Sequence, residues 1–166
     1  MNEPLITIIT VSYNAEEFIE KSILSVLNQN YKNIQYIIID GASKDNTPNI
    51  IRKYIKNINL YISETDSGIY DAINKGLKNA KGDLIKILNS DDTLPENSLK
   101  NVQEFYKKNN LKGTNSLIIG NTHVINRNNF ISKTIKKNTF SMIGFQTFNH
   151  PGWYITMEAT KNLGFY

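Results

Sequence analysis

Two adjacent carboxylates, Asp91 and Asp92, follow an apolar run and are the residues whose types and spacing most directly suggest chemistry. The run 82–88 reads as a buried strand, and the polar pair Asn89 and Ser90 separates it from the aspartates. Open α/β sheets bind ligands in a crevice outside the carboxyl ends of their strands. Hard oxygen donors at such a strand end suit Mg²⁺ or Mn²⁺, and a divalent ion in turn suits a phosphate.

The alternative is that the two aspartates only form a turn or cap a helix, as an Asp after a strand often does. The next residues already read as a helix start, with Thr93 as the cap, Pro95 in the first turn and Glu96 reaching back. The aspartates are then not needed to begin that helix and remain candidates for a ligand site.

Three strand and helix units precede this strand. Apolar runs at 5–10, 34–39 and 60–63 predict strands, and apolar residues at helical spacing predict helices over 15–29, from 47, and from 69 to a stop at Gly82. This alternation predicts an α/β fold with a mostly parallel sheet and helices on both faces. Because crossovers are right-handed, the strand ends Ser12, Asp40, Asp66 and Asp91 should lie along one edge.

The pattern changes after a helix predicted over 96–108. The runs 117–125 and 130–135 predict two strands around a turn at 126–129. From residue 139 the chain reads as loop and edge strand, and 157–163 predicts a last helix. No repeat or linker is evident, so we expect a single domain over residues 1–166.

Composition narrows the classes of protein. The chain has 166 residues, of which 40% are hydrophobic, enough for a core, and it has no cysteine, which excludes disulfides and zinc–thiolate sites. No stretch approaches the roughly 18 apolar residues of a membrane span, and the first residues lack a signal sequence. We expect a cytoplasmic protein.

Charge is distributed unevenly within the net +4. The chain is net acidic up to Glu96 and strongly basic beyond it. This basic part could rest on the inner face of a membrane, meet a phosphorylated substrate or nucleic acid, or be an ordinary solvated surface. Few aromatic residues interrupt it and it has no nucleic-acid motif, so we expect no nucleic acid. A solvated surface is the commoner case for such charges, and peripheral membrane contact is the functional alternative. The basic residues are Lys107, Lys108, Lys112, Arg127, Lys133, Lys136 and Lys137.

The chain lacks a glycine-rich phosphate loop. Neither G-x-G-x-x-G nor a P-loop lysine motif follows the first strand, which argues against simple dinucleotide and ATP sites. Nucleotidyl transfer usually needs a loop rich in glycine and basic residues there, and 12–16 does not supply one. A diphosphate would instead be neutralised by a metal held on carboxylates.

Four motifs together resemble family 2 glycosyltransferases, most closely the polysaccharide-biosynthesis members with the GT-A fold. They are IITVSYN at 8–14, IIDGASKD at 38–45, DSGIYDAINKG at 66–76 and LNSDD at 88–92. The resemblance is close over residues 4–110 and loose beyond. It implies a Rossmann-like three-layer sandwich, in which 1–110 is the nucleotide-sugar-binding half and 111–166 a partial acceptor-side half.

The resemblance also implies roles for individual residues. Thr10, Ser12 and Asn14 would line the base and ribose pocket, and Asp40, with Ser43 in the same motif, would accept a hydrogen bond from the nucleobase. Asp66, Asn74 and Lys75 fall in the segment that closes over the donor. Asp91 takes the metal position of the D-x-D motif, Asp92 serves metal or sugar, Ser90 lies between, and Asn89 stands where the first Asp would be.

The activity implied is a metal-dependent, inverting transfer of a sugar from a nucleotide-diphosphate donor, a UDP-sugar, to a glycan or lipid-linked acceptor. Family members place the catalytic base after a Gly-Phe-Asp-Glu-like stretch, and this chain ends with Gly164, Phe165 and Tyr166, about where such a stretch would begin. We therefore expect a truncated catalytic domain that turns its donor over poorly. The alternative is a catalytically incompetent nucleotide-sugar binding module.

Asp92 is one catalytic candidate, and two late residues are the other candidates for the base within the chain. Glu158 could act so or be a surface residue of a terminal helix, and His150 could face the acceptor or metal or belong to a structural loop. Trp153 could pack in the core or stack on an acceptor sugar.

Overall fold

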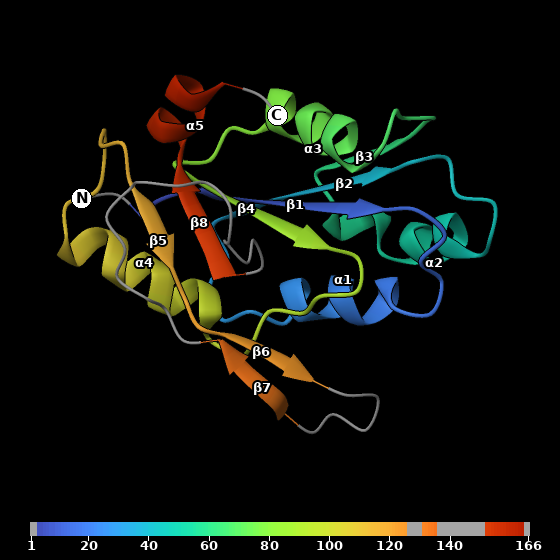
Figure 1. Cartoon of the computed structure of the whole chain (residues 1–166), viewed down its shortest axis with the longest axis horizontal. Helices are drawn as coiled ribbons and strands as arrows, with labels where there is room; N and C mark the ends of the chain where they lie inside the picture. Colours follow the sequence, from blue (N-terminus) through green and yellow to red (C-terminus); the bar gives the residue numbers. More distant parts are fainter. Residues whose placement is uncertain (1–2, 126–130, 136–151, 165–166) are drawn as a thin grey trace.

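The computed structural model describes residues 3–125, 131–135 and 152–164. Six strands form one sheet in the order β3-β2-β1-β4-β8-β5, and β6 and β7 pair separately (Figure 1). The strands are β1 (Ile6–Ser12), β2 (Ile34–Asp40), β3 (Leu60–Ser63), β4 (Leu84–Asn89), β5 (Leu117–Ile119), β6 (Thr122–Ile125), β7 (Ile131–Ile135) and β8 (Trp153–Thr156). The helices are α1 (Ile19–Leu27), α2 (Thr47–Lys53), α3 (Ile69–Asn79), α4 (Ser98–Lys108) and α5 (Met157–Leu163), with a 3₁₀ turn at Ile55–Asn57.

β1 lies at the centre of the parallel part of the sheet. It pairs with β2 on one side, where Ser12 is opposite Asp40, and with β4 on the other, where Val11 is opposite Asn89. Every residue of β1 is buried, which explains its uninterrupted run of apolar and β-branched residues. The chain builds β2 and β3 outward on one side of β1 and then returns to place β4 on the other. Such a reversal of strand order opens a crevice at the carboxyl ends.

Alternate residues of the strands supply two separate apolar cores. Ile6 and Ile8 belong to a core completed by α1, α2 and α4, whereas Ile9 and Val11 belong to a core completed by α3. Figure 1 shows α3 on one side of the sheet and α1 on the other. The predicted three-layer α/β sandwich with a mostly parallel sheet is therefore confirmed.

The second half of the sheet is antiparallel. β8 lies between β4 and β5 and runs against both, so the predicted edge strand near residue 153 is wrong, and β5 forms that edge instead. The single strand predicted over 117–125 is two, because β5 joins the main sheet while β6 pairs with β7 as an antiparallel ribbon. The turn predicted at 126–129 lies outside the described residues.

Several helix boundaries differ from those predicted. α1 begins at Ile19 rather than residue 15, because residues 15–18 form a turn in which the N–H groups of Phe18 and Ile19 donate to the carbonyl of Ala15 (3.0 and 2.9 Å). The N–H of Ala15 donates to the Oγ1 of Thr47, 2.7 Å away. α4 begins after Asn97, which adopts a left-handed conformation (φ 61°), so Thr93 does not cap it. Tertiary contacts and backbone conformation at these sites override the local sequence pattern.

Gly82 does not stop α3, which ends at Asn79. It lies instead against β1, where a β-carbon would come within 2.6 Å of the Thr7 nitrogen and 2.8 Å of the Leu5 carbonyl oxygen. Glycine is needed at this position for the close approach of two backbone segments.

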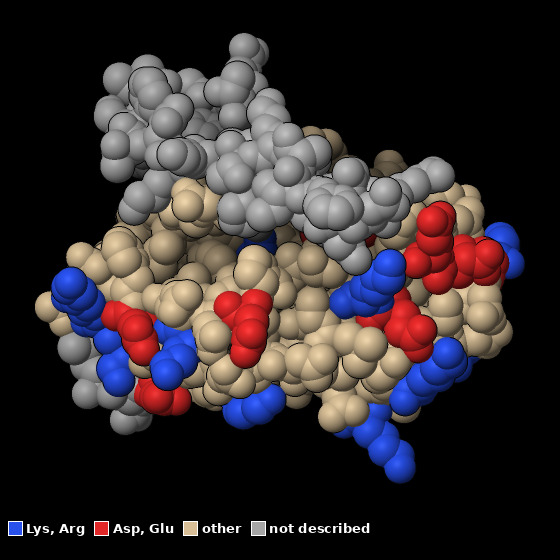
Figure 2. Space-filling model, turned by 90° about the horizontal axis from the view of Figure 1, so that it is seen from below, with Lys and Arg blue, Asp and Glu red and all other residues tan. Residues whose placement is uncertain are grey.

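The described helices include none long and apolar enough to cross a bilayer. On the face shown in Figure 2, the basic and acidic side chains of the described residues are interspersed. Lys107, Lys108 and Lys112 of the predicted basic surface lie in and just after α4. Arg127, Lys136 and Lys137 lie outside the described residues.

Candidate functional site

A cavity of about 840 Å³ opens at the carboxyl ends of the parallel strands, where the strand order reverses. It brings together three of the four strand-end residues that we predicted to meet, Ser12, Asp66 and Asp91. Its lining residues are Val11, Ser12, Tyr13, Asn14, Ala15, Phe18, Gly41, Thr65, Asp66, Gly68, Ile69, Ala72, Asn89, Ser90 and Asp91.

Asp40, the fourth strand-end residue, is fully buried and does not line the cavity. Its carboxylate accepts hydrogen bonds from the Oγ of Ser12 (3.2 Å), the Oγ of Ser63 (2.7 Å), and both the backbone N–H (3.1 Å) and the Oγ of Ser43. Four donors match the acceptor capacity of a carboxylate. Asp40 thus ties the ends of β1, β2 and β3 together, and its predicted contact with a nucleobase stays a prediction.

The turn after β1 is joined to the loop after β2 through Asn14. Its N–H donates to the Oγ of Ser43 (2.8 Å), and its Oδ1 accepts from the N–H of Lys44 (2.9 Å). Asn14 has a left-handed backbone (φ 47°), which asparagine tolerates better than most residues. Thr10, by contrast, is buried in the sheet with its Oγ1 3.1 Å from the hydroxyl of Tyr36, so it lies outside the cavity.

Exposed apolar side chains at the cavity were not predicted. Tyr13 is 66% exposed, Phe18 43% and Ile69 51%. Large apolar groups left in solvent around a concave site commonly mark a ligand surface. The signal in the sequence is the position of Tyr13, which directly follows the first strand.

The loop after β3 carries Asp66 to the cavity. The Oδ1 of Asp66 accepts a hydrogen bond from the N–H of Gly68 (3.0 Å). A β-carbon on Gly41 would come within 2.7 Å of the Asp66 Oδ2 and 3.3 Å of the Tyr13 ring. The Asp66 carboxylate therefore lies directly against the backbone at the end of β2.

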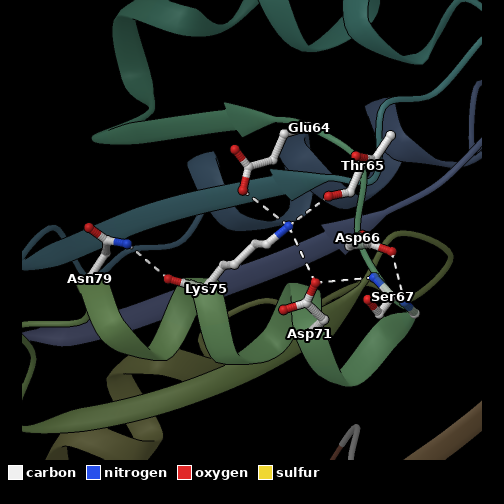
Figure 3. A network of polar contacts seen from close by, with 8 residues as sticks. Glu64, Thr65, Asp66, Ser67, Asp71, Lys75 and Asn79 are labelled. Atoms are coloured by element: carbon white, nitrogen blue, oxygen red, sulfur yellow. Dashed lines mark hydrogen bonds and ion pairs between the residues drawn. The ribbon is translucent and has the colours of Figure 1, made fainter.

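Asn74 and Lys75 belong to α3 and do not line the cavity. The Nζ of Lys75 points toward the loop after β3 and meets Thr65, Glu64 and Asp71 (Figure 3). Desolvation lowers the pKa of Lys75, but its hydrogen bond to Glu64 and the charge of Asp71 outweigh this and leave the pKa raised. The predicted contact of Asn74 and Lys75 with a donor stays a prediction.

The acidic pair after β4 divides into an outer and an inner carboxylate. Asp91 is exposed and lines the cavity with Asn89 and Ser90. Asp92 is half-buried, and its Oδ2 accepts a hydrogen bond from the side-chain amide of Asn89 (3.2 Å). Burial first, and the neighbouring charge of Asp91 second, raise the pKa of Asp92. The charge of Lys86 and the hydrogen bond from Asn89 act in the opposite direction without cancelling this rise, so a cation would further stabilise the ionised pair.

Lys86 is a fully buried lysine in β4, a few residues before the acidic pair. Burial lowers the pKa of Lys86 to about 8, while the charge of Asp92 acts in the opposite direction. Sequence reasoning missed this residue, although a lone lysine within the apolar run 84–88 was a visible signal.

A metal at this site would have few side-chain ligands among the described residues. Across residues 3–125, 131–135 and 152–164, no group of three or more His, Asp or Glu side chains could hold a metal ion. Magnesium, however, is usually bound by one or two carboxylates together with water and substrate phosphates. The pair Asp91 and Asp92 fits that kind of site.

Of the two late candidates for a catalytic base, the structure describes only Glu158, which does not line the cavity. Glu158 follows β8, whose Thr156 is opposite Leu84, and the N–H of Met157 donates to the carbonyl of Asp83 (3.0 Å). Glu158 therefore lies near the amino end of β4, about 20 Å from its carboxyl end at roughly 3.3 Å per residue. His150 lies outside the described residues. Trp153 is half-buried at the start of β8.

The family model described as Glycosyl transferase family 2 matches residues 7–163. A relative from Escherichia coli, UDP-Glc:alpha-D-GlcNAc-diphosphoundecaprenol beta-1,3-glucosyltransferase WfgD, is 37% identical over 136 residues, which are 81% of this chain and 52% of the relative. The chain spans about half the length of the curated relatives it matches, from 42% to 52% for three of them.

Two solved structures share the fold. The crystal structure of S. aureus TarS 1-349 in complex with UDP-GlcNAc has a TM-score of 0.61 and 24% identity, covering 69% of this chain and 33% of the TarS 1-349 chain. The mannosyltransferase PcManGT from Pyrobaculum calidifontis, in complex with GDP-Man and Mn²⁺, has a TM-score of 0.60 and 23% identity, covering 76% of this chain and 37% of that protein.

Proposed function

Because this chain belongs to glycosyl transferase family 2, we propose that its switch-point cavity binds a nucleoside diphosphate sugar and supplies the donor side of an inverting, metal-dependent glycosyltransferase. We propose a UDP-sugar as the donor and a hydroxyl of a glycan or lipid-linked glycan as the acceptor. The observation that carries the proposal is the presence of Ser12, Asp66 and Asp91, from three separate strand ends, in one cavity.

The size and lining of the cavity support this ligand class. Its volume of about 840 Å³ falls in the range of small-molecule sites. Exposed Tyr13, Phe18 and Ile69 offer apolar surface for a base or sugar ring, while Asp91 offers a carboxylate for a metal-bound diphosphate. One cavity thus combines the two chemistries that a nucleotide sugar presents.

The relatives support the choice of donor and acceptor. WfgD is named for a UDP-Glc donor and a diphosphoundecaprenol-linked acceptor, and TarS has been crystallised with UDP-GlcNAc. From these names we propose transfer from a UDP-sugar donor to a lipid-linked glycan acceptor.

Asp91 and Asp92 are the residues proposed to hold Mn²⁺ or Mg²⁺. The raised pKa of Asp92 comes first from burial and second from the charge of Asp91, and a bound cation would oppose both by favouring the ionised carboxylates. A divalent ion bound there would stabilise the negative charge that develops on the departing diphosphate. Asn89 contributes by holding Asp92 in place through its side-chain amide.

The transfer itself is a single displacement at the anomeric carbon. The acceptor oxygen forms the new C–O bond, its proton passes to a base, and the bond to the diphosphate oxygen breaks with its electron pair remaining on that oxygen. Attack from the face opposite the leaving group inverts the anomeric centre. Since Glu158 lies near the amino end of β4, away from the cavity, it is not proposed as the base.

Calorimetric titration with UDP, GDP, CDP and TDP, with and without Mn²⁺, tests the donor site. UDP should bind most tightly and only weakly without the metal. Asp91→Asn should remove the metal dependence, whereas Glu96→Gln, a nearby exposed carboxylate outside the cavity lining, should not. Failure of every nucleotide to bind would refute the proposal.

Catalysis is tested separately by following UDP release from UDP-glucose and UDP-GlcNAc in the presence of a polyprenyl-diphosphate sugar. Transfer supports the enzyme, and binding without either transfer or donor hydrolysis would instead identify a nucleotide-sugar binding module.

A further inference from the structure

The ammonium group of Lys75 is surrounded by three acceptors. Its Nζ lies 2.9 Å from the carbonyl oxygen of Thr65, 3.1 Å from the Oε1 of Glu64 and 3.5 Å from the Oδ2 of Asp71 (Figure 3). An ammonium group has three protons to donate. Every donor of Lys75 is therefore directed at the loop after β3 or at its own helix, and none at the cavity.

The Lys75 side chain is also more enclosed than its acidic partners. It is 18% exposed, compared with 57% for Glu64 and 40% for Asp71. Ion pairs between fully exposed side chains contribute little. The hydrogen bond to the Thr65 carbonyl differs, because it joins a charged and largely enclosed donor to the backbone of the loop.

Asp71 makes a second connection to the same loop. Its Oδ2 accepts a hydrogen bond from the backbone N–H of Ser67, 3.1 Å away, while it also pairs with Lys75 one helical turn later. Thr65 and Ser67 are the immediate neighbours of Asp66. Consequently Lys75 and Asp71 of α3 hydrogen-bond to the backbone on both sides of Asp66, the residue that lines the cavity.

Gly41 limits Asp66 from the opposite direction. Because a β-carbon at Gly41 would come within 2.7 Å of the Asp66 Oδ2, the carboxylate rests against the end of β2. The hydrogen bonds from α3 to the loop and the close contact with Gly41 together define where the Asp66 carboxylate lies. This end of the cavity is formed by β2 and β3, whereas Asp91 follows β4 on the other side of β1.

We propose that Lys75 is a positioning residue which, together with Asp71, fixes the backbone on both sides of Asp66 and so holds that carboxylate in the donor cavity. Lys75 acts through the loop, without touching the donor. The predicted loss of nucleotide affinity rests on the proposed function. The hydrogen bonds by which Lys75 and Asp71 fix the loop are independent of any ligand.

Hydrogen exchange of the ligand-free chain tests whether Lys75 fixes the loop around Asp66. In Lys75→Met the backbone amides of Ser67 and Gly68 should exchange about tenfold faster, because losing a charged hydrogen bond corresponds to roughly that factor. Lys75→Arg should restore part of the protection. Lys100→Met, which removes an exposed lysine from α4, is the matched control and should leave both amides unchanged.

UDP titration in the presence of Mn²⁺ then tests the consequence. The dissociation constant for UDP should rise about five- to tenfold in Lys75→Met and less in Lys75→Arg. In each variant it should rise by the same factor as the exchange rate of the Ser67 and Gly68 amides. Asp71→Asn, which keeps an acceptor for Ser67 but removes the charge, should move both measurements in the same direction. Parallel change is the signature of a residue acting through the loop.

Two results would overturn the inference. Weaker UDP binding with unchanged exchange of Ser67 and Gly68 would mean that Lys75 contacts the nucleotide directly. Unchanged exchange in Lys75→Met, whatever the affinity, would mean that the loop does not depend on Lys75. Failure of the unmodified chain to bind UDP would refute the proposed function. The exchange data would still decide whether Lys75 fixes the loop.

Discussion

The ammonium of Lys86 lies 5.3 Å from the centre of the Tyr154 ring, in the interior of the protein. The two residues come from neighbouring antiparallel strands, one position beyond the pair Ile85 and Ile155. A cation is attracted to an aromatic face, but burial opposes charge. Burial lowers the pKa of Lys86 to about 8 and raises the pKa of Tyr154 to about 12. Both shifts show an interior that disfavours ionisation.

Lys86→Met should stabilise the protein at pH 7. A lysine pKa lowered from 10.5 to about 8 means that the folded state gives up a proton which the unfolded state retains. Below pH 8 the cost of the buried charge is fully present, and it is relieved as the pH rises toward 10.5. The free energy of unfolding, measured with urea, should rise by about 3 kcal/mol in the variant at pH 7.

The pH dependence provides the control for Lys86. The unmodified protein should gain stability between pH 8 and 9.5, whereas Lys86→Met should lack this gain. Lys100→Met, at an exposed position of α4, should follow the unmodified protein to within about 0.5 kcal/mol. Lower stability of Lys86→Met at pH 7 would show that the attraction of the Lys86 charge to the Tyr154 ring and to the Asp92 charge outweighs the cost of burial.

Asp40→Asn should destabilise the fold by about 2–4 kcal/mol, because an amide group would place its own N–H groups against donors that now meet a carboxylate. Chemical unfolding measures this loss. Ser63→Ala, which removes only one of the four donors, should cost about 1 kcal/mol. Equal effects of the two substitutions would contradict the view that Asp40 joins three strand ends.

Gly41→Ala should weaken UDP binding with little effect on stability. The added carbon would displace the Asp66 carboxylate, which is the end of a side chain and can move, so the free energy of unfolding should change by less than about 1 kcal/mol. The dissociation constant should rise about fivefold or more, from a loss of roughly 1 kcal/mol. Gly120→Ala is the matched control, since its β-carbon would have only an ordinary contact, 3.6 Å from the Gly152 oxygen.

Gly82→Ala should destabilise the protein by about 2–3 kcal/mol. The added carbon would meet backbone atoms of Thr7 and Leu5, which cannot move without disturbing β1. Thermal and urea unfolding of the variant, compared with Gly120→Ala, measure the cost. A change of less than 0.5 kcal/mol would show that β1 and the segment before β4 can separate easily.

The parallel half of the fold follows from the sequence because its signals are local. The buried run of β1 and the helical spacing of Ile69, Ile73 and Leu77 identify a strand and a helix within a few residues. The order of the strands then places Ser12, Asp66 and Asp91 at one edge. The antiparallel half was harder, since whether β8 becomes an inner or an edge strand depends on pairing with residues about 70 positions earlier.

Local sequence patterns did not predict which aspartates would be buried and which would line the cavity. Asp40 and Asp91 both follow apolar runs, yet one is buried among serine donors and the other is exposed at the cavity. The difference arises from Ser12, Ser43 and Ser63, which the fold gathers from separate segments. Lys75 is a similar case, because only the folded loop shows which acceptors its ammonium meets.

The insertion of β8 between β4 and β5 has a consequence for biosynthesis. During translation the first four strands emerge from the ribosome long before residues 153–156, so the nascent sheet presents the open edge of β4 until the late strand arrives. Unpaired edges recruit other chains. Nascent chains halted shortly after β5 should therefore depend on chaperones more than nascent chains halted after α5.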